Sequence, residues 1–466
     1  MLTHRRILSC FLILSSLLSL FILPASAWDQ PEAPPAYEAL FPIPEFVEED
    51  SLSAVSESLD TYLNGKSILL LGDSLFAGYG LEDYSQSWCG MLKTQYGMEV
   101  TCKAVSGSTF GTSSSWGYKP GGYYYPICRR GLEAGDYDVV LVTGSGNDWY
   151  CEIPLGTDLT SRNTTNLMGA INTTIDRLQQ LYPNALILFS TSWNSTGKRN
   201  GLGLTTADYN KTFMAVCEAR GITYFKACDP NVSGIDSANQ AFRSQYFLTS
   251  TDFWHLNPTG NQLYLPTIAG WLEEKLLEHY TVAGFYDVEK TSWYADAVQY
   301  AHDHGLVQGV TLTSFDPEST MTRGMLITVL YRAANCPDVT GLTHPFEDIP
   351  ADAYYSDALL WGYSTGMIQG TDVTHFAPDD PVTREQLATF LYRYAKAEGT
   401  DYLPDDLSGF TDHAQVSDYA RRPISWAVGS DILHGMGNGT LAPQAKATRA
   451  QTVQLLTNYF RKFTTE

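Results

Sequence analysis

The chain has 466 residues, of which 44% are hydrophobic and 13% aromatic, the composition of a packed protein and not of a disordered one. At roughly 150 residues per domain, this length predicts about three folded units. The formal net charge of -22, from 51 acidic and 29 basic residues, makes nucleic acid and anionic lipid poor partners, because both need a basic face on the protein.

The first segment has the pattern of a secretory signal peptide. Arg5 and Arg6 give it a positive start, an apolar stretch follows over residues 7–24, and residues 25–27 (Ala-Ser-Ala) supply a small-residue cleavage site. The apolar stretch is short for a spanning helix, and no later stretch is long and apolar enough to span. We therefore expect residues 1–27 to be removed and the protein to be secreted, with no integral membrane segment after cleavage.

Residues 28–64 are typical of a linker. They are rich in proline as far as Pro44, they add acidic residues after it, and they lack the apolar periodicity of a core element. The seven cysteines that remain after residue 27 form no Cys-x-x-Cys pair, so we expect no metal site. We expect no cofactor either.

From residue 65 to residue 280, short apolar runs alternate with amphipathic stretches. The expected strands are 67–71, 99–105, 137–143, 185–190 and 222–227. The expected helices are 85–96, 166–181, 206–220 and 258–279. This alternation predicts one α/β domain, built on a parallel sheet that helices cover on both faces.

After residue 280 the pattern changes to three segments of similar layout, repeated about every sixty residues. Each opens on a Phe-x-Asp motif and later carries a threonine-arginine pair that caps a second helix. Internal repetition of this kind indicates stacked units that share a core. We therefore expect an all-α region of three modules, at residues 281–340, 341–405 and 406–466.

Four short polar stretches carry the candidate chemistry of the α/β domain. They are residues 72–75 (Gly-Asp-Ser-Leu), 106–109, 144–148 and 252–258. The first three directly follow expected strands, and a parallel sheet brings the carboxyl ends of its strands to one edge. The four stretches can therefore converge there although they are far apart in sequence.

The residue types in these stretches suit nucleophilic catalysis. A serine hydroxyl such as that of Ser74 is a weak nucleophile unless a base takes its proton. His255 is the candidate base, and Asp252 is placed to hold its tautomer. A tetrahedral oxyanion then needs fixed donors, for which the candidates are the backbone N–H groups of Ser74 and Gly107 and the side-chain amide of Asn147.

The same stretches resemble the sequence blocks of the SGNH (GDSL-type) hydrolases, over about residues 65–280. Ser74 matches the nucleophile, Gly107 the second-block glycine and Asn147 the third-block asparagine. Asp252 and His255 match the final Asp-x-x-His block. The resemblance implies a flavodoxin-like three-layer fold and ester hydrolysis by Ser-His-Asp chemistry through an acyl-enzyme.

One position departs from the family pattern. The third block usually reads Gly-x-Asn-Asp, and Ser145 stands in place of its first glycine; a serine fits there if φ stays below zero.

An aromatic, glycine-rich loop at 116–125, together with Trp149 and Tyr150, suits sugar rings, although packing under a long loop explains it equally well. We prefer an acetyl ester on a carbohydrate. The alternatives are a lipase or phospholipase and a non-catalytic, S-layer-associated surface protein that binds carbohydrate.

The three C-terminal repeats resemble S-layer homology (SLH) modules. The family motif Ile-Thr-Arg-Ala-Glu appears at 321–325, 382–386 and 447–451, each time with the threonine and arginine kept and the final glutamate replaced. The resemblance implies a three-pronged bundle that binds an anionic secondary cell-wall polysaccharide, on a bacterial cell wall or S-layer. A guanidinium at a helix N-terminus suits a carboxylate, so the candidate polymer-binding residues are Arg323, Arg384 and Arg449.

Overall fold

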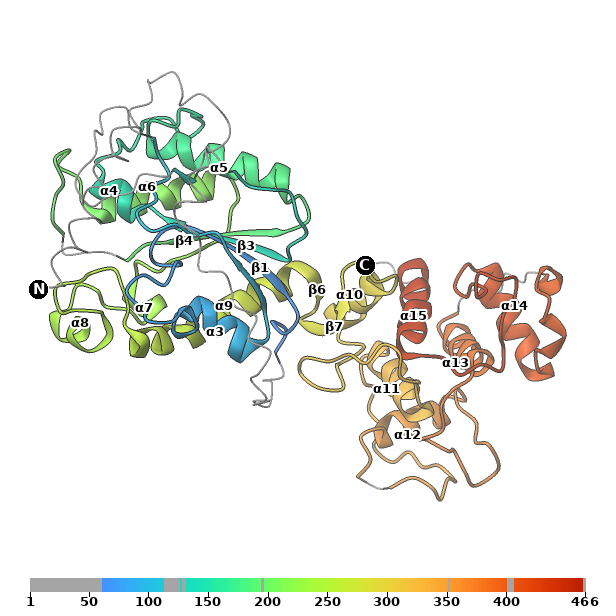
Figure 1. Cartoon of the computed structure of the whole chain (residues 1–466). Helices are drawn as coiled ribbons and strands as arrows, with labels where there is room; N and C mark the ends of the chain where they lie inside the picture. Colours follow the sequence, from blue (N-terminus) through green and yellow to red (C-terminus); the bar gives the residue numbers. More distant parts are fainter. Residues whose placement is uncertain are drawn as a thin grey trace, which may run out of the picture. The chain divides into compact units, whose positions relative to one another are not determined.

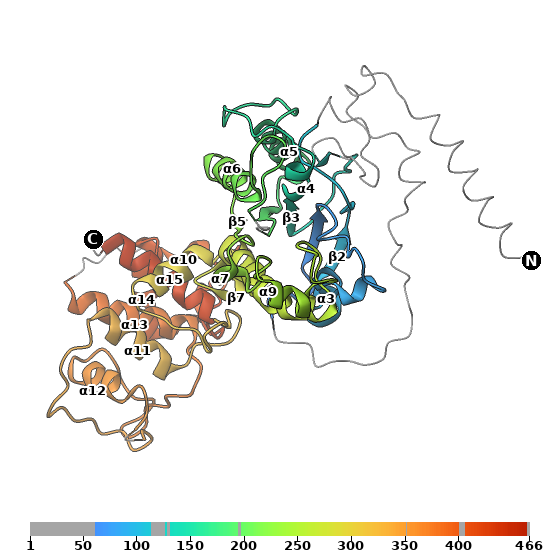
Figure 2. The same ribbon diagram turned by 90° about the vertical axis from the view of Figure 1, so that its left-hand side faces the viewer.

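The computed structural model describes residues 61–112, 126–127, 131–193, 197–350, 352–399 and 406–463. The chain divides into two compact units, residues 1–276 and 277–466 (Figures 1 and 2). The candidate signal peptide, most of the candidate linker and the aromatic loop at 116–125 lie outside the described residues. Within the described part, no helix combines the length and the apolarity needed to cross a bilayer.

The first unit is built on a five-stranded parallel sheet. Its strands are β1 (Ser67–Leu71), β2 (Glu99–Cys102), β3 (Val139–Gly144), β4 (Leu186–Thr191) and β5 (Tyr224–Phe225). They pair in the order β2-β1-β3-β4-β5, which is the flavodoxin-like order. The predicted parallel sheet is confirmed, although β2 and β5 at its edges are shorter than the apolar runs suggested. The central strand β3 is buried along its whole length, because helices cover both faces.

Helices flank this sheet on both sides. They are α3 (Trp88–Tyr96), α4 (Gly146–Tyr150), α5 (Leu167–Leu181), α6 (Thr206–Ala219), α7 (Pro230–Ser233), α8 (Gln240–Tyr246) and α9 (Pro258–Tyr280), with a 3-10 turn, η3 (Tyr84–Gln86). Helices α5 and α6 lie on one face, and α3 and α9 on the other (Figure 1). On the first face, Val140 and Val142 of β3 share a core with Ile171 of α5 and Phe213 of α6.

Local sequence sets where several of these helices begin. The Asn166 side chain accepts the N–H of Gly169 at 2.9 Å at the start of α5. Asn257 does the same for Gly260 at 2.9 Å, and Pro258 follows as the first residue of α9. The cap at Asn257 matters for the site, because it fixes the end of the stretch 252–258.

The segment predicted as a linker ends earlier than residue 64. Leu63 is fully buried, and Tyr62 is 8% exposed. The hydroxyl of Thr61 and the N–H of Tyr62 both donate to Glu273 Oε1 of α9, each at 2.6 Å. Residues 61–64 are therefore part of the first unit, because they pack on its last helix.

The second unit is helical apart from a short hairpin at its start. The hairpin is β6 (Thr281–Val282) and β7 (Phe285–Glu289), and the α-helices are α10 (Ala295–Asp303), α11 (Arg323–Ala333), α12 (Ser356–Ser364), α13 (Arg384–Ala397), α14 (Arg421–Gly429) and α15 (Arg449–Phe463). Three 3-10 turns precede α14: η5 (Leu407–Gly409), η6 (His413–Gln415) and η7 (Asp418–Ala420).

In the second unit, the helices pack in pairs that join different modules. Helix α11 packs on α12, α13 packs on α14, and α15 closes the ring by packing on α10. Each pair joins the second helix of one module to the first helix of the next, and all three share one apolar core. No module completes its core alone, which is the behaviour that the sequence repeats predict.

The aspartate of each Phe-x-Asp motif has the same task in all three modules. Asp287, Asp348 and Asp412 each accept two consecutive backbone N–H groups from the loop before the second helix. The second residue of each pair has a positive φ, 58° at Asp316 and 55° at Ala377. A carboxylate therefore stabilises each of these sharp turns, and this explains why the motif recurs.

Candidate active site

The turn after β1 presents Ser74 at the edge of the sheet. The Asp73 carbonyl accepts the N–H groups of Phe76 and Ala77, and Asp73 Oδ1 accepts the N–H of Leu75 at 3.0 Å. A Cβ on Gly72 would lie 2.5 Å from Cγ2 of Thr143, so this close approach of β1 to β3 requires glycine. The turn lies where the strand order reverses between β1 and β3, the point at which open α/β sheets form ligand crevices.

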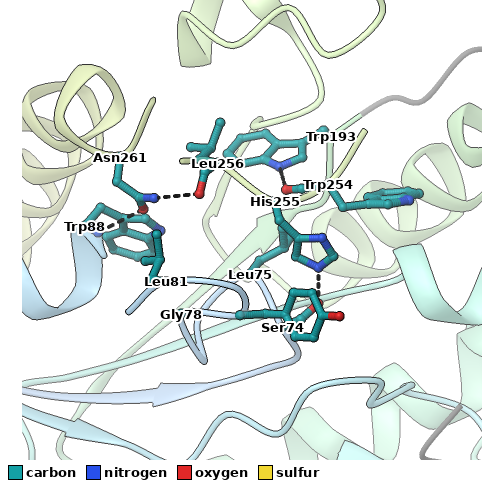
Figure 3. A pocket seen from close by; sticks show the side chains of 11 residues that line it. Ser74, Leu75, Gly78, Leu81, Trp88, Trp193, Trp254, His255, Leu256 and Asn261 are labelled. Atoms are coloured by element: carbon teal, nitrogen blue, oxygen red, sulfur yellow. Dashed lines mark hydrogen bonds between the residues drawn. The ribbon is translucent and has the colours of Figure 1, made fainter. Parts of the chain in front are cut away.

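Ser74, His255 and Asp252 form one continuous chain of hydrogen bonds. Ser74 Oγ lies 2.9 Å from His255 Nε2 (Figure 3), and His255 Nδ1 lies 2.9 Å from Asp252 Oδ2. Burial raises the pKa of Asp252, but hydrogen bonds from the His255 ring and from backbone N–H groups outweigh burial and hold that pKa below its ordinary value. An ionised carboxylate only accepts, so Nδ1 carries the ring proton and Nε2 is left to accept from the serine hydroxyl.

The loop that carries the aspartate and the histidine is fixed by the same carboxylate. Asp252 Oδ1 accepts the N–H groups of Trp254 at 2.8 Å and His255 at 3.0 Å. The His255 carbonyl accepts the N–H of Leu248 at 3.0 Å, and Trp193 Nε1 donates to the Trp254 carbonyl at 2.8 Å (Figure 3). One oxygen of Asp252 therefore shapes the backbone while the other orients the imidazole.

Arg243 holds this loop in place, and no sequence pattern predicted that role. Its side chain is only 6% exposed. Nε donates to the Ser250 carbonyl at 2.9 Å, and Nη1 donates to the Ser237 carbonyl at 2.8 Å. The guanidinium also stacks over the ring of Phe253 at 4.1 Å. Because two of these contacts are to backbone carbonyls, no pairing of residue types reveals them in advance.

Two of the three predicted oxyanion donors are backbone N–H groups that make no hydrogen bond within the described residues. Neither the N–H of Ser74 nor that of Gly107 donates to any atom of the described residues. Gly107 has φ +80°, in the left-handed region that favours glycine. The third donor is already occupied: Asn147 Nδ2 lies 2.9 Å from the Ser108 carbonyl and 3.3 Å from Asp73 Oδ2. For Asn147 to donate to an oxyanion, one of these two hydrogen bonds would have to break.

Asp148 ties the second polar stretch to the third. Its fully buried carboxylate accepts the N–H of Phe110 at 2.9 Å and that of Gly111 at 2.8 Å. Burial raises its pKa to about 7, although the hydrogen bonds from the N–H groups of Gly111 and Phe110 lower that pKa; the nearby charge of Asp73 is a smaller cause of the rise. Asp148 thus holds the loop of Gly107 against the helix of the predicted oxyanion asparagine. The only signal for this role in the sequence is a second acid beside that asparagine.

The condition under which a serine would fit at position 145 is not met, because its φ is +83° and not below zero. The turn from β3 into α4 requires a left-handed residue there, and a non-glycine residue adopts that conformation at a cost of roughly 1–2 kcal/mol. The Ser145 hydroxyl is buried, 3.1 Å from Asn210 Oδ1 and 3.2 Å from Ser192 Oγ. These hydrogen bonds offset part of the strain and are what a glycine would lack.

A small pocket opens beside Ser74 and His255 (Figure 3). Its cavity volume is about 20 Å³, which is room for roughly one water-sized group. The walls are largely aromatic and aliphatic, formed by Leu75, Gly78, Tyr79, Leu81, Trp88, Trp193, Trp254, Leu256 and Asn261. In the described part of the chain, no cluster of three His, Cys, Asp or Glu residues is arranged to hold a metal ion.

The three candidate polymer-binding arginines are buried between modules of the second unit. Arg323, Arg384 and Arg449 are 5%, 7% and 6% exposed, and burial lowers the pKa of each. Their Nε and Nη2 atoms donate to backbone carbonyls of another module, at Phe376 and Gln369, at Leu441 and His434, and at Phe315 and Gln308 respectively. These hydrogen bonds link the modules in a closed ring. Polymer binding by the three arginines stays a prediction.

Comparisons with known proteins match two parts of the chain. Residues 70–263 match the GDSL-like lipase/acylhydrolase family, and residues 284–324, 345–388 and 409–453 each match the S-layer homology domain. Among curated proteins, the chain is 29% identical over 175 residues to an amylopullulanase of Thermoanaerobacterium thermosulfurigenes, covering 37% of this chain and 9% of that one. It is 33% identical over 167 residues to a surface-layer 125 kDa protein of Lysinibacillus sphaericus, covering 35% and 14%.

Among solved structures, the chain is similar to a putative GDSL-like lipase from Bacteroides ovatus, with 18% identity and a TM-score of 0.32 over 45% of this chain and 99% of that one. It is also similar to a family two carbohydrate esterase from Clostridium thermocellum in complex with cellohexaose, with 16% identity and a TM-score of 0.29 over 45% and 64%. The chain spans between 9% and 25% of the length of the first three curated relatives it matches.

Proposed function

We propose that the chain is a serine esterase that removes acetyl groups from carbohydrate. Its residues 70–263 match the GDSL-like lipase/acylhydrolase family of ester hydrolases, and three S-layer homology domains follow. The S-layer homology domains indicate a location at the cell surface. The observation that carries the proposal is the hydrogen-bonded chain from Ser74 through His255 to Asp252.

In this reaction Ser74 Oγ attacks the ester carbonyl while His255 Nε2 takes the hydroxyl proton. The tetrahedral oxyanion accepts hydrogen bonds from the N–H groups of Ser74 and Gly107 and from the Asn147 amide. His255 then gives its proton to the leaving alcohol, and an acetyl-enzyme remains on Ser74. Water attacks this ester with His255 again as base, which releases acetate and restores the serine. Asp252 keeps the imidazole oriented and stabilises its charged form.

The size of the pocket supports a short acyl group. Its interior volume of about 20 Å³ and its tryptophan-rich wall suit a group of about the size of a methyl, and a longer chain would have to extend out of the pocket. This favours an acetyl esterase over the lipase or phospholipase alternative. A surface location beside wall carbohydrate supports a sugar ester as substrate.

Hydrolysis of 4-nitrophenyl esters tests the proposal. We expect wild-type protein to release nitrophenol from the acetate ester with a kcat/KM at least tenfold above that for the octanoate ester. Ser74→Ala removes the nucleophile and should lower acetate turnover at least about a thousandfold. The matched control is Ser244→Ala, on the exposed side of α8, which should leave turnover unchanged. Full activity in Ser74→Ala, or a preference for octanoate, would refute the assignment.

The S-layer homology domains further lead us to propose that the second unit anchors the chain to an anionic wall polysaccharide. Co-sedimentation of the full chain with purified bacterial cell walls tests this anchoring. We expect the protein in the pellet, and its release when the secondary polysaccharide is stripped from the walls. Equal sedimentation with stripped walls would contradict the anchoring role.

A further inference from the structure

Tyr79 holds an exposed ring directly against the candidate catalytic histidine. The two ring centroids are 4.6 Å apart, with the ring planes tilted by 41°. Tyr79 is nevertheless 54% exposed, so the rest of its ring faces solvent at the mouth of the pocket. No step of the hydrolysis above uses this side chain.

The backbone around Tyr79 is fixed to both halves of the site. Its N–H donates to the Ser74 carbonyl at 3.3 Å, so Tyr79 ends the same turn that presents the nucleophile. Gly78 and Gly80 flank it with φ of +69° and +79°. A Cβ on Gly80 would collide with Cδ1 of Leu248, the residue whose N–H donates to the His255 carbonyl. The turn therefore packs on the histidine loop, and Tyr79 keeps its position relative to His255.

The direction of proton transfer indicates which part of the ester would contact the Tyr79 ring. His255 delivers its proton to the leaving oxygen, so the alcohol part of the ester must lie next to the imidazole. The open part of the Tyr79 ring borders that space. Aromatic faces pack against the apolar C–H faces of sugar rings, and the phenol hydroxyl adds a polar edge.

We propose that Tyr79 is a specificity-determining residue that receives the alcohol part of the ester as a sugar ring. This inference rests on the proposed function, because it requires an ester whose leaving group departs beside His255. The acyl side and the alcohol side of the substrate then have separate determinants. The tryptophan-lined interior of the pocket limits the acyl group, and Tyr79, at the exposed rim of the same pocket beside His255, selects a ring on the alcohol.

A pair of esters with the same acyl group separates this role from a structural one. Methyl 6-O-acetylglucoside carries a ring on its leaving alcohol, and ethyl acetate carries none. We expect Tyr79→Ala to lower the ratio of kcat/KM for the acetylglucoside to that for ethyl acetate by about five- to tenfold, mainly through KM. Tyr79→Phe keeps the aromatic face, so its ratio should stay within about twofold of wild type.

The outcomes distinguish this inference from the proposed function. An equal loss on both esters in Tyr79→Ala leaves the ratio unchanged and would mean that the ring acts only through His255, which overturns the sugar role. No change on either ester overturns it as well. If wild-type protein hydrolyses neither ester, the proposed function fails and takes the inference with it. Labelling of Ser74 by a fluorophosphonate in each variant shows that the site is still folded.

Discussion

At the scale of single residues, two aspartates of the site, Asp252 and Asp148, illustrate what the sequence can and cannot predict. Asp252 was predictable as the partner of His255, because the chemistry of a serine nucleophile calls for a base and a carboxylate. Asp148 was not, since its partners are the backbone N–H groups of Phe110 and Gly111. Every residue carries such groups, so no residue type marks them. Arg243 escaped prediction for the same reason.

Asp148 gives a prediction for the pH dependence of stability. Its pKa is raised from 3.8 to about 7 in the folded chain, so the native state keeps a proton that the unfolded chain releases near pH 4. Its contribution to stability is full below about pH 4 and is lost as the pH rises towards 7, with a slope of up to about 1.4 kcal/mol per pH unit. Asp148→Asn should remove this slope.

Urea unfolding of both proteins between pH 4.5 and 7.5 measures the effect. Other groups titrate in the same range, so the informative quantity is the difference between the two unfolding free energies. That difference should change steadily up to about pH 7 and level off above it. Parallel curves would show that Asp148 does not titrate in this window.

At the scale of elements, the strand ends were predictable and the turns between elements were not. Apolar runs predicted β1, β3 and β4 closely, because strands buried on both faces need continuous apolar sequence. The short helix α4 and the left-handed Ser145 before it were missed. Tertiary contacts impose both of them, since the chain must leave β3 and bring the amide of Asn147 next to Asp73.

The contact between the ends of β1 and β3 can be tested with two glycines. Gly72→Ala places a methyl group 2.5 Å from Cγ2 and 3.1 Å from the carbonyl of Thr143, so the strand ends must separate. We expect a loss of about 1–3 kcal/mol in unfolding free energy and at least a tenfold loss of esterase activity. Gly131→Ala is the control, because a Cβ there meets no atom of the described residues within 4 Å. Similar behaviour of the two variants in urea unfolding and turnover would show that the close approach of β1 to β3 does not require glycine at position 72.

At the scale of the whole molecule, the repeats predicted the number of C-terminal modules but not how they interlock. The Phe-x-Asp and Thr-Arg motifs recur three times, and this threefold repeat can be recognised in the sequence. The closure of the ring by α15 on α10 joins segments far apart in sequence, and repetition alone does not specify it. The arginines looked like ligand-binding residues by type, yet their guanidinium groups bind carbonyls of neighbouring modules.

Arg384 tests the closed ring. Its side chain is 7% exposed and donates to the carbonyls of Leu441 and His434, each at 2.8 Å. Arg384→Ala leaves both carbonyls without this donor, so we expect the second unit to lose about 2–3 kcal/mol of stability. Arg421→Ala removes a 55% exposed arginine and should cost under about 1 kcal/mol. Calorimetry of the full chain compares them, and equal transition midpoints would argue against a structural role for Arg384.

The central claim is that Ser74 is a nucleophile activated by His255, and covalent labelling tests it most directly. Wild-type protein treated with a fluorophosphonate should gain one phosphonyl group, located by peptide mass spectrometry on Ser74. Ser74→Ala should gain none, and His255→Ala should react far more slowly, because the hydroxyl then lacks its base. Labelling at another serine, or equal labelling of Ser74 without His255, would contradict this mechanism.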